Sequence, residues 1–147
     1  MKAKTLLFTC LMAAFALLSC DKKADAVEFS YKEPVLSWGA SPATIKAQET
    51  RTIILVDDNE TLAYADQGNF VQFCIYFFDD SGHLKSAVIH LKNNNAETLN
   101  QAKEFIGLRY PYVGVNGSNT IYGNTTTIVS ITTSDLGLSI IYTPPVP

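Results

Sequence analysis

Apolar and polar residues alternate along several short stretches of this chain. An apolar residue at every second position is typical of a strand that buries one face. In the first half, the alternation predicts strands at Arg51 to Val56, Thr61 to Asp66, Asn69 to Phe78 and Leu84 to Lys92. The segments DDNE, DQG and DDSG lie between these strands, and their Asp, Asn and Gly residues favour turns. We therefore expect four consecutive strands here.

The third of these predicted strands has two different faces. One face is formed by Val71, Phe73, Ile75 and Phe77. The other contains Gln72, Cys74 and Tyr76. Because the first set is uniformly apolar, we predict that it faces the core and that Gln72 and Tyr76 lie on the opposite, open face.

The periodicity becomes helical in two places. Ser41 is a suitable N-cap and Pro42 suits the first helical turn, so a short helix is predicted at about 42–49. Further along, Asn95 is a suitable cap, and apolar residues recur at Leu99, Ala102, Phe105 and Ile106. With Gly107 as a terminator, this stripe predicts a second helix at about 96–106.

Thr and Ile are enriched near the end of the chain, which favours strands at about 125–133 and 136–143. Proline cannot donate to a strand ladder, so Pro144 and Pro145 are expected to end the sheet. Near the start, Val27, Phe29 and Tyr31 alternate with polar residues and predict an edge strand.

The order of these elements is a helix followed by strands, at about 42–92 and again at about 95–143. It predicts an α+β fold with two helix-then-antiparallel-strands repeats, in which the helices pack on one face of a curved antiparallel sheet. We expect a single α+β domain at 34–147.

The first nineteen residues have the pattern of an export signal, with a positive start followed by a short apolar segment from Leu6 to Leu18. This segment is shorter than the roughly 20 residues that a membrane-spanning helix needs. Leu17-Leu18-Ser19-Cys20 resembles the lipobox of bacterial lipoproteins. The resemblance implies cleavage after residue 19, a covalent lipid on Cys20 and a tether at 20–33.

Net charge and cysteine count narrow the function further. Cleavage would remove Lys2 and Lys4 and no acid, leaving 9 basic and 14 acidic residues and a net charge of about −5. A basic footprint for nucleic acid is therefore missing. Of the three cysteines, only Cys74 would remain unmodified in the mature chain, so we predict no internal disulfide and treat Cys74 as a small core residue.

Two further resemblances concern the folded part. Gly39-Ala40-Ser41, Ile45 and YFFDDSGHL at 76–84 resemble motifs of the small outer-membrane lipoprotein family that includes BamE. The repeated order is similar to the β-lactamase-inhibitor-protein architecture, which binds partners through a sheet face. The segment Pro34 to Ser41 looks like one found in many small lipoproteins of Bacteroidota. None of these resemblances implies a catalytic residue.

The sequence offers little for catalysis or for metal binding. His83 and His90 lie seven residues apart along one predicted strand, and their side chains are expected on opposite faces. DDSG at 79–82 lacks the spacing of a calcium loop and is interpreted as a hairpin turn. Phosphate-loop, dinucleotide and nucleophile-elbow motifs are missing. We expect no catalytic activity, no metal and no cofactor besides the lipid on Cys20. An enzyme would require His83, His90 and Asp79 to meet in one cleft.

What remains is a binding surface. The expected function is that of a non-catalytic lipoprotein, anchored to the outer membrane, facing the periplasm and binding an envelope protein through the open sheet face. The inner membrane and the cell surface stay open as alternatives, because Asp21 after the cysteine is read differently in different bacterial lineages. The predicted contact residues are Trp38, Gln72, Tyr76, Tyr110 and Tyr112, since aromatic residues bury much area with few rotors. The alternative is a small-molecule or glycan binder that uses the same rings around a pocket of roughly 300 Å³ or more.

Overall fold

The computed structural model describes residues 27–57 and 61–146 of the 147-residue chain. The expected export signal, Cys20 and the start of the tether lie outside these residues. The described elements follow the order α2 (Pro42–Gln48), β1 (Thr52–Asp57), β2 (Thr61–Ala65), β3 (Val71–Phe78), β4 (Leu84–Leu91), α3 (Ala96–Gly107), β5 (Tyr112–Asn116), β6 (Asn119–Gly123), β7 (Ile128–Ser134) and β8 (Gly137–Thr143).

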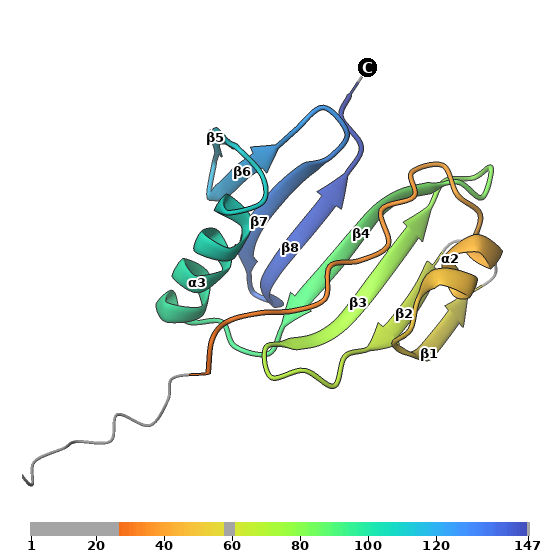
Figure 1. Ribbon diagram of the computed structural model, residues 1–147, viewed down its shortest axis with the longest axis horizontal. Coiled ribbons are helices and arrows are strands. Elements are labelled where there is room, and N and C mark those ends of the chain that lie inside the picture. Colours follow the sequence, from red (N-terminus) through yellow and green to blue (C-terminus); the bar gives the residue numbers. More distant parts are fainter. Residues whose placement is uncertain (1–26, 58–60, 147) are drawn as a thin grey trace, which may run out of the picture.

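The eight strands form one antiparallel sheet in the order β1-β2-β3-β4-β8-β7-β6-β5 (Figure 1). Neighbouring strands in the sequence pair with each other, except that β4 pairs with β8 after the chain has passed through α3 and three further strands. β1 and β5 are consequently the two edges of the sheet.

The predicted fold of two helix-then-strands repeats was wrong. The structure is mostly one continuous eight-stranded sheet, and its two described helices are only 7 and 12 residues long. Helices of this length cannot cover so broad a sheet. Much of the covered face is instead crossed by the extended chain at 27–41, which we call the covering segment (Figure 1).

Local signals explain both helices. The Ser41 hydroxyl accepts a hydrogen bond from the Thr44 amide at 3.3 Å, and Pro42 starts α2 as predicted. Asn95 caps α3 by accepting from the Thr98 amide at 2.8 Å. Gly107 is the last residue of α3, one residue beyond the predicted end.

Most of the predicted strands are confirmed within a few residues, with two corrections. Residues 27–31 form no strand, because they cross the covered face as part of the covering segment, where Phe29 is buried. β5 and β6 were missed as strands. Their sequences contain Gly114, Asn119 and Gly123, residues that are rare in strands, and pairing within the sheet overrides this preference.

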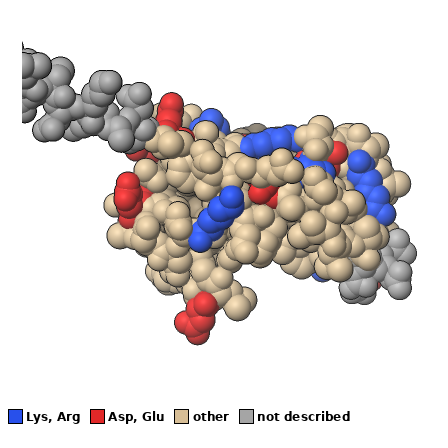
Figure 2. Space-filling model, turned by 90° about the horizontal axis from the view of Figure 1, so that it is seen from below, with Lys and Arg blue, Asp and Glu red and all other residues tan. Residues whose placement is uncertain are grey.

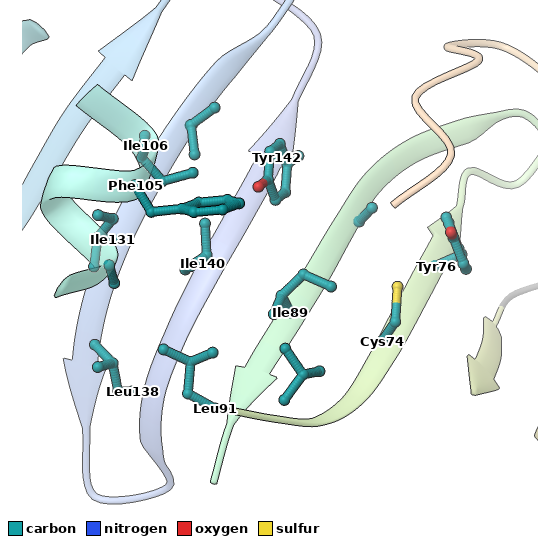
Figure 3. Close-up of a cluster of buried hydrophobic side chains, with 14 of the residues drawn as sticks. Cys74, Tyr76, Ile89, Leu91, Phe105, Ile106, Ile131, Leu138, Ile140 and Tyr142 are labelled. Atoms are coloured by element: carbon teal, nitrogen blue, oxygen red, sulfur yellow. The ribbon is translucent and has the colours of Figure 1, made fainter. Parts of the chain in front are cut away.

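The core lies between the covered face and the elements packed on it. Figure 3 shows its central side chains on neighbouring strands, with Cys74 and Tyr76 on β3, Ile89 on β4, and Ile140 and Tyr142 on β8. All five are fully buried, and Phe105 and Ile106 of α3 pack over them in the same cluster. Cys74 is fully buried, which confirms it as a core residue, and this burial raises the pKa of its thiol to about 12.

This arrangement reverses the predicted faces of β3 from Phe73 onward. Before the register shift between Val71 and Phe73, Val71 is buried and Gln72 is exposed, as predicted. Phe73, Ile75 and Phe77 are half-exposed on the open face, whereas Cys74 and Tyr76 are buried. The Tyr76 hydroxyl has partners only on the covered side, where it donates to Glu49 and accepts from the Val35 amide at 2.8 Å. These hydrogen bonds stabilise the burial of the Tyr76 side of β3. The apolar periodicity of the sequence does not predict that this side is buried.

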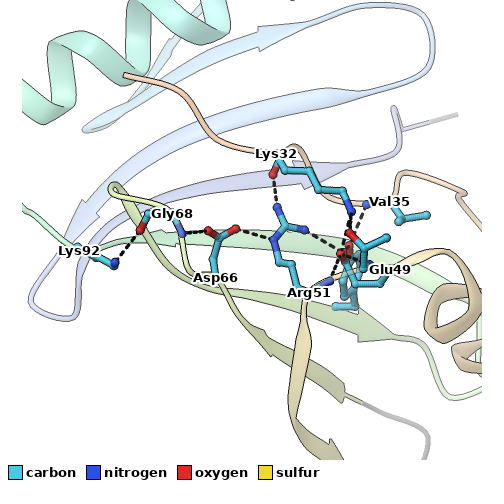
Figure 4. Close-up of polar contacts among 9 residues, drawn as sticks. Lys32, Val35, Glu49, Arg51, Asp66, Gly68 and Lys92 are labelled. Atoms are coloured by element: carbon cyan, nitrogen blue, oxygen red, sulfur yellow. Dashed lines mark hydrogen bonds and ion pairs between the residues drawn. The ribbon is translucent and has the colours of Figure 1, made fainter. Parts of the chain in front are cut away.

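A buried carboxylate ties the covering segment to the sheet. The Glu49 side chain is fully buried and contacts Arg51 Nη1 at 2.8 Å and Lys32 Nζ at 3.1 Å (Figure 4). It also accepts hydrogen bonds from the backbone amides of Thr50 and Arg51. Arg51 Nε in turn contacts Asp66 Oδ2 at 2.7 Å. Burial acts to raise the pKa of Glu49, but the hydrogen bonds from Tyr76 and Arg51 and the positive charge of Arg51 outweigh it and lower this pKa to about 2.

Replacing Glu49 with Gln is expected to destabilise the protein by about 3 kcal/mol, because the buried Arg51 and Tyr76 groups lose their anionic partner. Urea unfolding measures this change. Glu104→Gln, at an exposed position on α3, is the matched control and should stay within about 0.5 kcal/mol of wild type.

The difference in unfolding free energy between wild type and Glu49→Gln should also depend on pH. A lowered carboxylate pKa stabilises the fold fully above the ordinary value of 4.5, and this stabilisation is lost as the pH falls through about 2. The gap in unfolding free energy should therefore narrow between pH 5 and pH 2. A constant gap over this range would show that Glu49 does not act through its charge.

Candidate functional site

The face of the sheet opposite the covering segment carries neither of the two described helices, and we call it the open face. Paired residues on neighbouring strands project to the same side, so the register defines rows across it. The central row crosses all eight strands and consists of Leu55, Ala63, Ile75, Val88, Ile141, Ser130, Ile121 and Gly114.

Two flanking rows widen the open face. One contains Ala65, Phe73, His90, Ser139 and Thr132. The other contains Thr61, Phe77 and Ser86 on one side of the sheet and Thr143, Ile128 and Gly123 on the other. None of these residues is Lys, Arg, Asp or Glu, and the register adds one acid, Asp57 of β1, which pairs with Thr61 at the end of the second flanking row. The open face is therefore apolar with interspersed hydroxyl groups.

The size of this face is that of a macromolecular contact. Strands about 4.8 Å apart place the ends of the central row roughly 34 Å from each other, and the three rows together span about 14 Å. The resulting area is on the order of 500 Å², which is close to the largest apolar patch of a typical monomer, and such patches are often functional. Figure 2 views the molecule from below Figure 1, along the sheet rather than onto the open face, and on this side charged side chains cover only a minor part of the surface.

His90 is the one residue in these rows with a side chain that titrates near neutral pH. Its ring stacks on Phe73 with centroids 4.7 Å apart and planes 8° apart, and its Nδ1 lies 3.1 Å from Ser139 Oγ. Burial lowers the pKa of His90 below its usual value. Burial therefore favours the uncharged ring, which together with Phe73 forms a flat aromatic surface.

The predicted contact residues do not converge on one site. Tyr76 is fully buried, and Tyr110 is nearly buried with its hydroxyl donating to Glu33 at 3.0 Å. Trp38 is half-buried in the covering segment, and its indole Nε1 donates to the Thr126 carbonyl at 2.9 Å. These three side chains stabilise the fold.

Gln72 and Tyr112 are exposed, but they lie on β3 and β5, with β4, β8, β7 and β6 between them. Gln72 falls at a register shift of β3, and 63% of Tyr112 is exposed on the edge strand β5. Residues that sequence reasoning missed as surface groups are Phe73, Ile75 and Phe77. The alternation of Ser130 and Thr132 with the buried Val129 and Ile131 on β7 contained the signal for the open face.

The geometry does not assemble the catalytic alternative. Asp79 accepts hydrogen bonds from the amides of Ser81 and His83, both at 2.9 Å, and Gly82 adopts a φ of 75°, so DDSG is a hairpin turn as predicted. His83 Nδ1 lies 3.7 Å from Asp79 at one end of β4. His90 lies seven residues further along β4, roughly 23 Å of extended chain. Within 27–57 and 61–146, no three His, Cys, Asp or Glu residues are grouped to hold a metal ion.

Two cavities among the described residues are not lined by the rings predicted to stack on a small ligand. A cavity of about 420 Å³ lies between the start of the covering segment and the end of α3 and is lined by residues including Phe29, Phe105 and Arg109. A second cavity, of about 310 Å³, lies beside Arg51 and Asp66. Trp38, Tyr110 and Tyr112 line neither cavity.

Neither described helix is long and apolar enough to cross a membrane. Comparison of the chain with protein-family models, with curated proteins and with solved structures gives no match.

Proposed function

We propose that this protein is a non-catalytic, lipid-anchored binding protein of the bacterial envelope, and that it binds another envelope protein on the open face. The observation that carries the proposal is the central row, which crosses all eight strands without a charged side chain. An apolar face of this breadth favours a partner whose own contact surface is uncharged, since an unpaired charge buried against it would cost several kcal/mol.

The anchor rests on the lipobox resemblance. A lipid on Cys20 would hold the folded part near the outer membrane, facing the periplasm, because two or three acyl chains give stable membrane binding where one is marginal. The six residues between Cys20 and Val27 can span at most roughly 24 Å, which would keep the folded part of the protein close to the bilayer.

A protein partner explains the open face better than a small ligand does. The rows form an extended surface, and the two cavities described above lie away from Phe73, Ile75 and Phe77. The hydroxyls of Ser130, Ser139 and Thr132 supply hydrogen-bonding groups among the apolar side chains. This mixture of apolar and neutral polar groups is common at the centre of protein interfaces, where charged residues are depleted.

Replacing Cys20 with Ala is expected to move the protein from the membrane fraction to the soluble fraction, because the acceptor of the lipid is lost. Immunoblotting after membrane fractionation measures the distribution. Cys10→Ala, a cysteine in the same leader, is the matched control and should stay in the membrane fraction. Release of both variants, or of neither, contradicts the assignment of the anchor to Cys20.

A photoreactive amino acid at Ser130 is expected to crosslink one defined protein in intact cells, because Ser130 lies in the central row. The same residue at Asn100, an exposed position on α3, is the matched control and should not give this adduct. Mass spectrometry identifies the adducts. Crosslinks to lipid alone, or equal crosslinking from both positions, would exclude the open face as a protein-binding surface.

Adding Ser130→Lys is expected to reduce the crosslink formed from a second open-face position, Ile141, at least tenfold. The reason is that the interface would then bury an unpaired charge. Asn100→Lys adds the same charge on the covered side of the molecule and should leave the yield unchanged. An undiminished yield in the Ser130→Lys protein would show that the partner does not contact the central row.

A further inference from the structure

The edge strand β1 has apolar side chains on both of its faces. The exposed fractions of Ile53, Ile54, Leu55 and Val56 are 41%, 59%, 51% and 54%. Successive residues of a strand point to opposite faces, so an edge strand with one solvated face should alternate apolar with polar residues. A continuous apolar run is instead typical of a strand that has neighbours on both sides.

This edge has one of the usual protections, a bulge between Ile53 and Leu55, and lacks the others along residues 52–56. Natural edge strands usually avoid unwanted pairing through charged side chains, proline or bulges. Residues 52–56 contain no charged residue and no proline, and Asp57 at the end of β1 is the one charged residue of the strand. The bulge leaves Ile54 without a Cα partner in β2, and this side chain is 59% exposed.

We infer that β1 pairs antiparallel with β1 of a second copy of this chain, which joins the two sheets edge to edge. The sequence of the strand is what favours a second copy. An antiparallel pairing centred between residues 54 and 55 places Ile53 opposite Val56 of the other copy and Ile54 opposite Leu55. Paired residues must lie on the same side of the sheet, and the bulge allows this, because Ile53 and Val56 pair with Tyr64 and Leu62 on one side of β2. Every apolar position is then matched by an apolar position, and no like charges within 52–56 oppose each other.

A two-fold pairing of β1 also gives a closed dimer rather than an open-ended assembly. The other edge, β5, is apolar as well, with Val113 and Val115 exposed, but Gly114 interrupts it and the Tyr112 ring packs on Tyr122 with centroids 5.8 Å apart. Pairing β1 of one copy with β5 of the next would extend without limit, whereas pairing β1 with β1 uses the same strand of both copies and stops at a dimer.

One strand pair buries less than the roughly 1,600 Å² of a standard interface, so the dimer should be weak in dilute solution. Confinement of the copies to one membrane would raise their effective concentration. Only this increase in effective concentration depends on the proposed lipid anchor. The strand pairing itself does not require the partner of the open face, although Leu55 of β1 also lies at the end of the central row.

Disulfide trapping in membranes that contain the full-length protein tests this pairing. The variant Ile54→Cys/Leu55→Cys places a thiol opposite a thiol in the inferred register, at two exposed positions where substitution should be tolerated. Mild oxidation is expected to convert a major fraction to a covalent dimer on non-reducing gels. Wild type measures the background from its own cysteines, of which Cys74 is buried.

Two matched variants make the result specific. Val113→Cys/Val115→Cys, on the other edge, should give at least fivefold less dimer than the β1 pair. Adding Val56→Lys to the β1 pair should lower its yield by a similar factor, because each copy then carries a charge into the contact, whereas adding Val115→Lys should not.

Three results would overturn the inference: no dimer from the β1 pair, equal dimer from both edges, or no effect of Val56→Lys. Failure of the proposed open-face function has a different signature, since it removes the crosslinked partner from Ser130 and leaves the disulfide dimer intact.

Discussion

The fold depends on covering one face of a sheet that its helices are too short to cover. α2 and α3 have 7 and 12 residues, and the covering segment crosses the remaining surface between them (Figure 1). Specific contacts fix this segment at several points. The Tyr31 and Tyr142 hydroxyls are 2.6 Å apart, the Val35 amide donates to Tyr76, and the backbones of Gly39 and Ala40 bond Leu84. A chain without these contacts would expose the most apolar face of the sheet to water, at about 25 cal/mol per Å².

Glu49 is the charged centre of this arrangement, and its burial also decides which face stays open. Its carboxylate binds Tyr76, Arg51 and Lys32, so these side chains must all lie on the covered side. Phe73, Ile75 and Phe77 then project to the opposite side, where no helix follows them. The binding surface that we propose is therefore a consequence of how the covered face is held, since the same strand supplies both faces.

Sequence patterns predicted both helices and most strands correctly, but they did not predict which face of a strand is buried. Both helices and most strands follow from signals within a few residues, such as the Ser41 and Asn95 caps and the hairpin at Asp79. β5 and β6 escaped prediction because their Gly and Asn residues resemble turns, and only pairing with β7 makes them strands. The contact residues Tyr76 and Tyr110 were assigned to the surface, yet they lie in the core, because aromatic residues suit an interface and a core equally well.

The sequence by itself determined where the chain turns, which residues cap the helices and, through the lipobox resemblance, where an anchor is expected, since these depend on neighbouring residues. The tertiary structure decided that the strands join into one sheet through β4 and β8, and it decided that Tyr76 rather than Phe77 is buried. Both faces of β3 are apolar enough to form a core, so periodicity leaves the choice open. Glu49 and Val35, which are distant from β3 in the sequence, form hydrogen bonds with Tyr76 on one side of the sheet only, and that side is therefore buried.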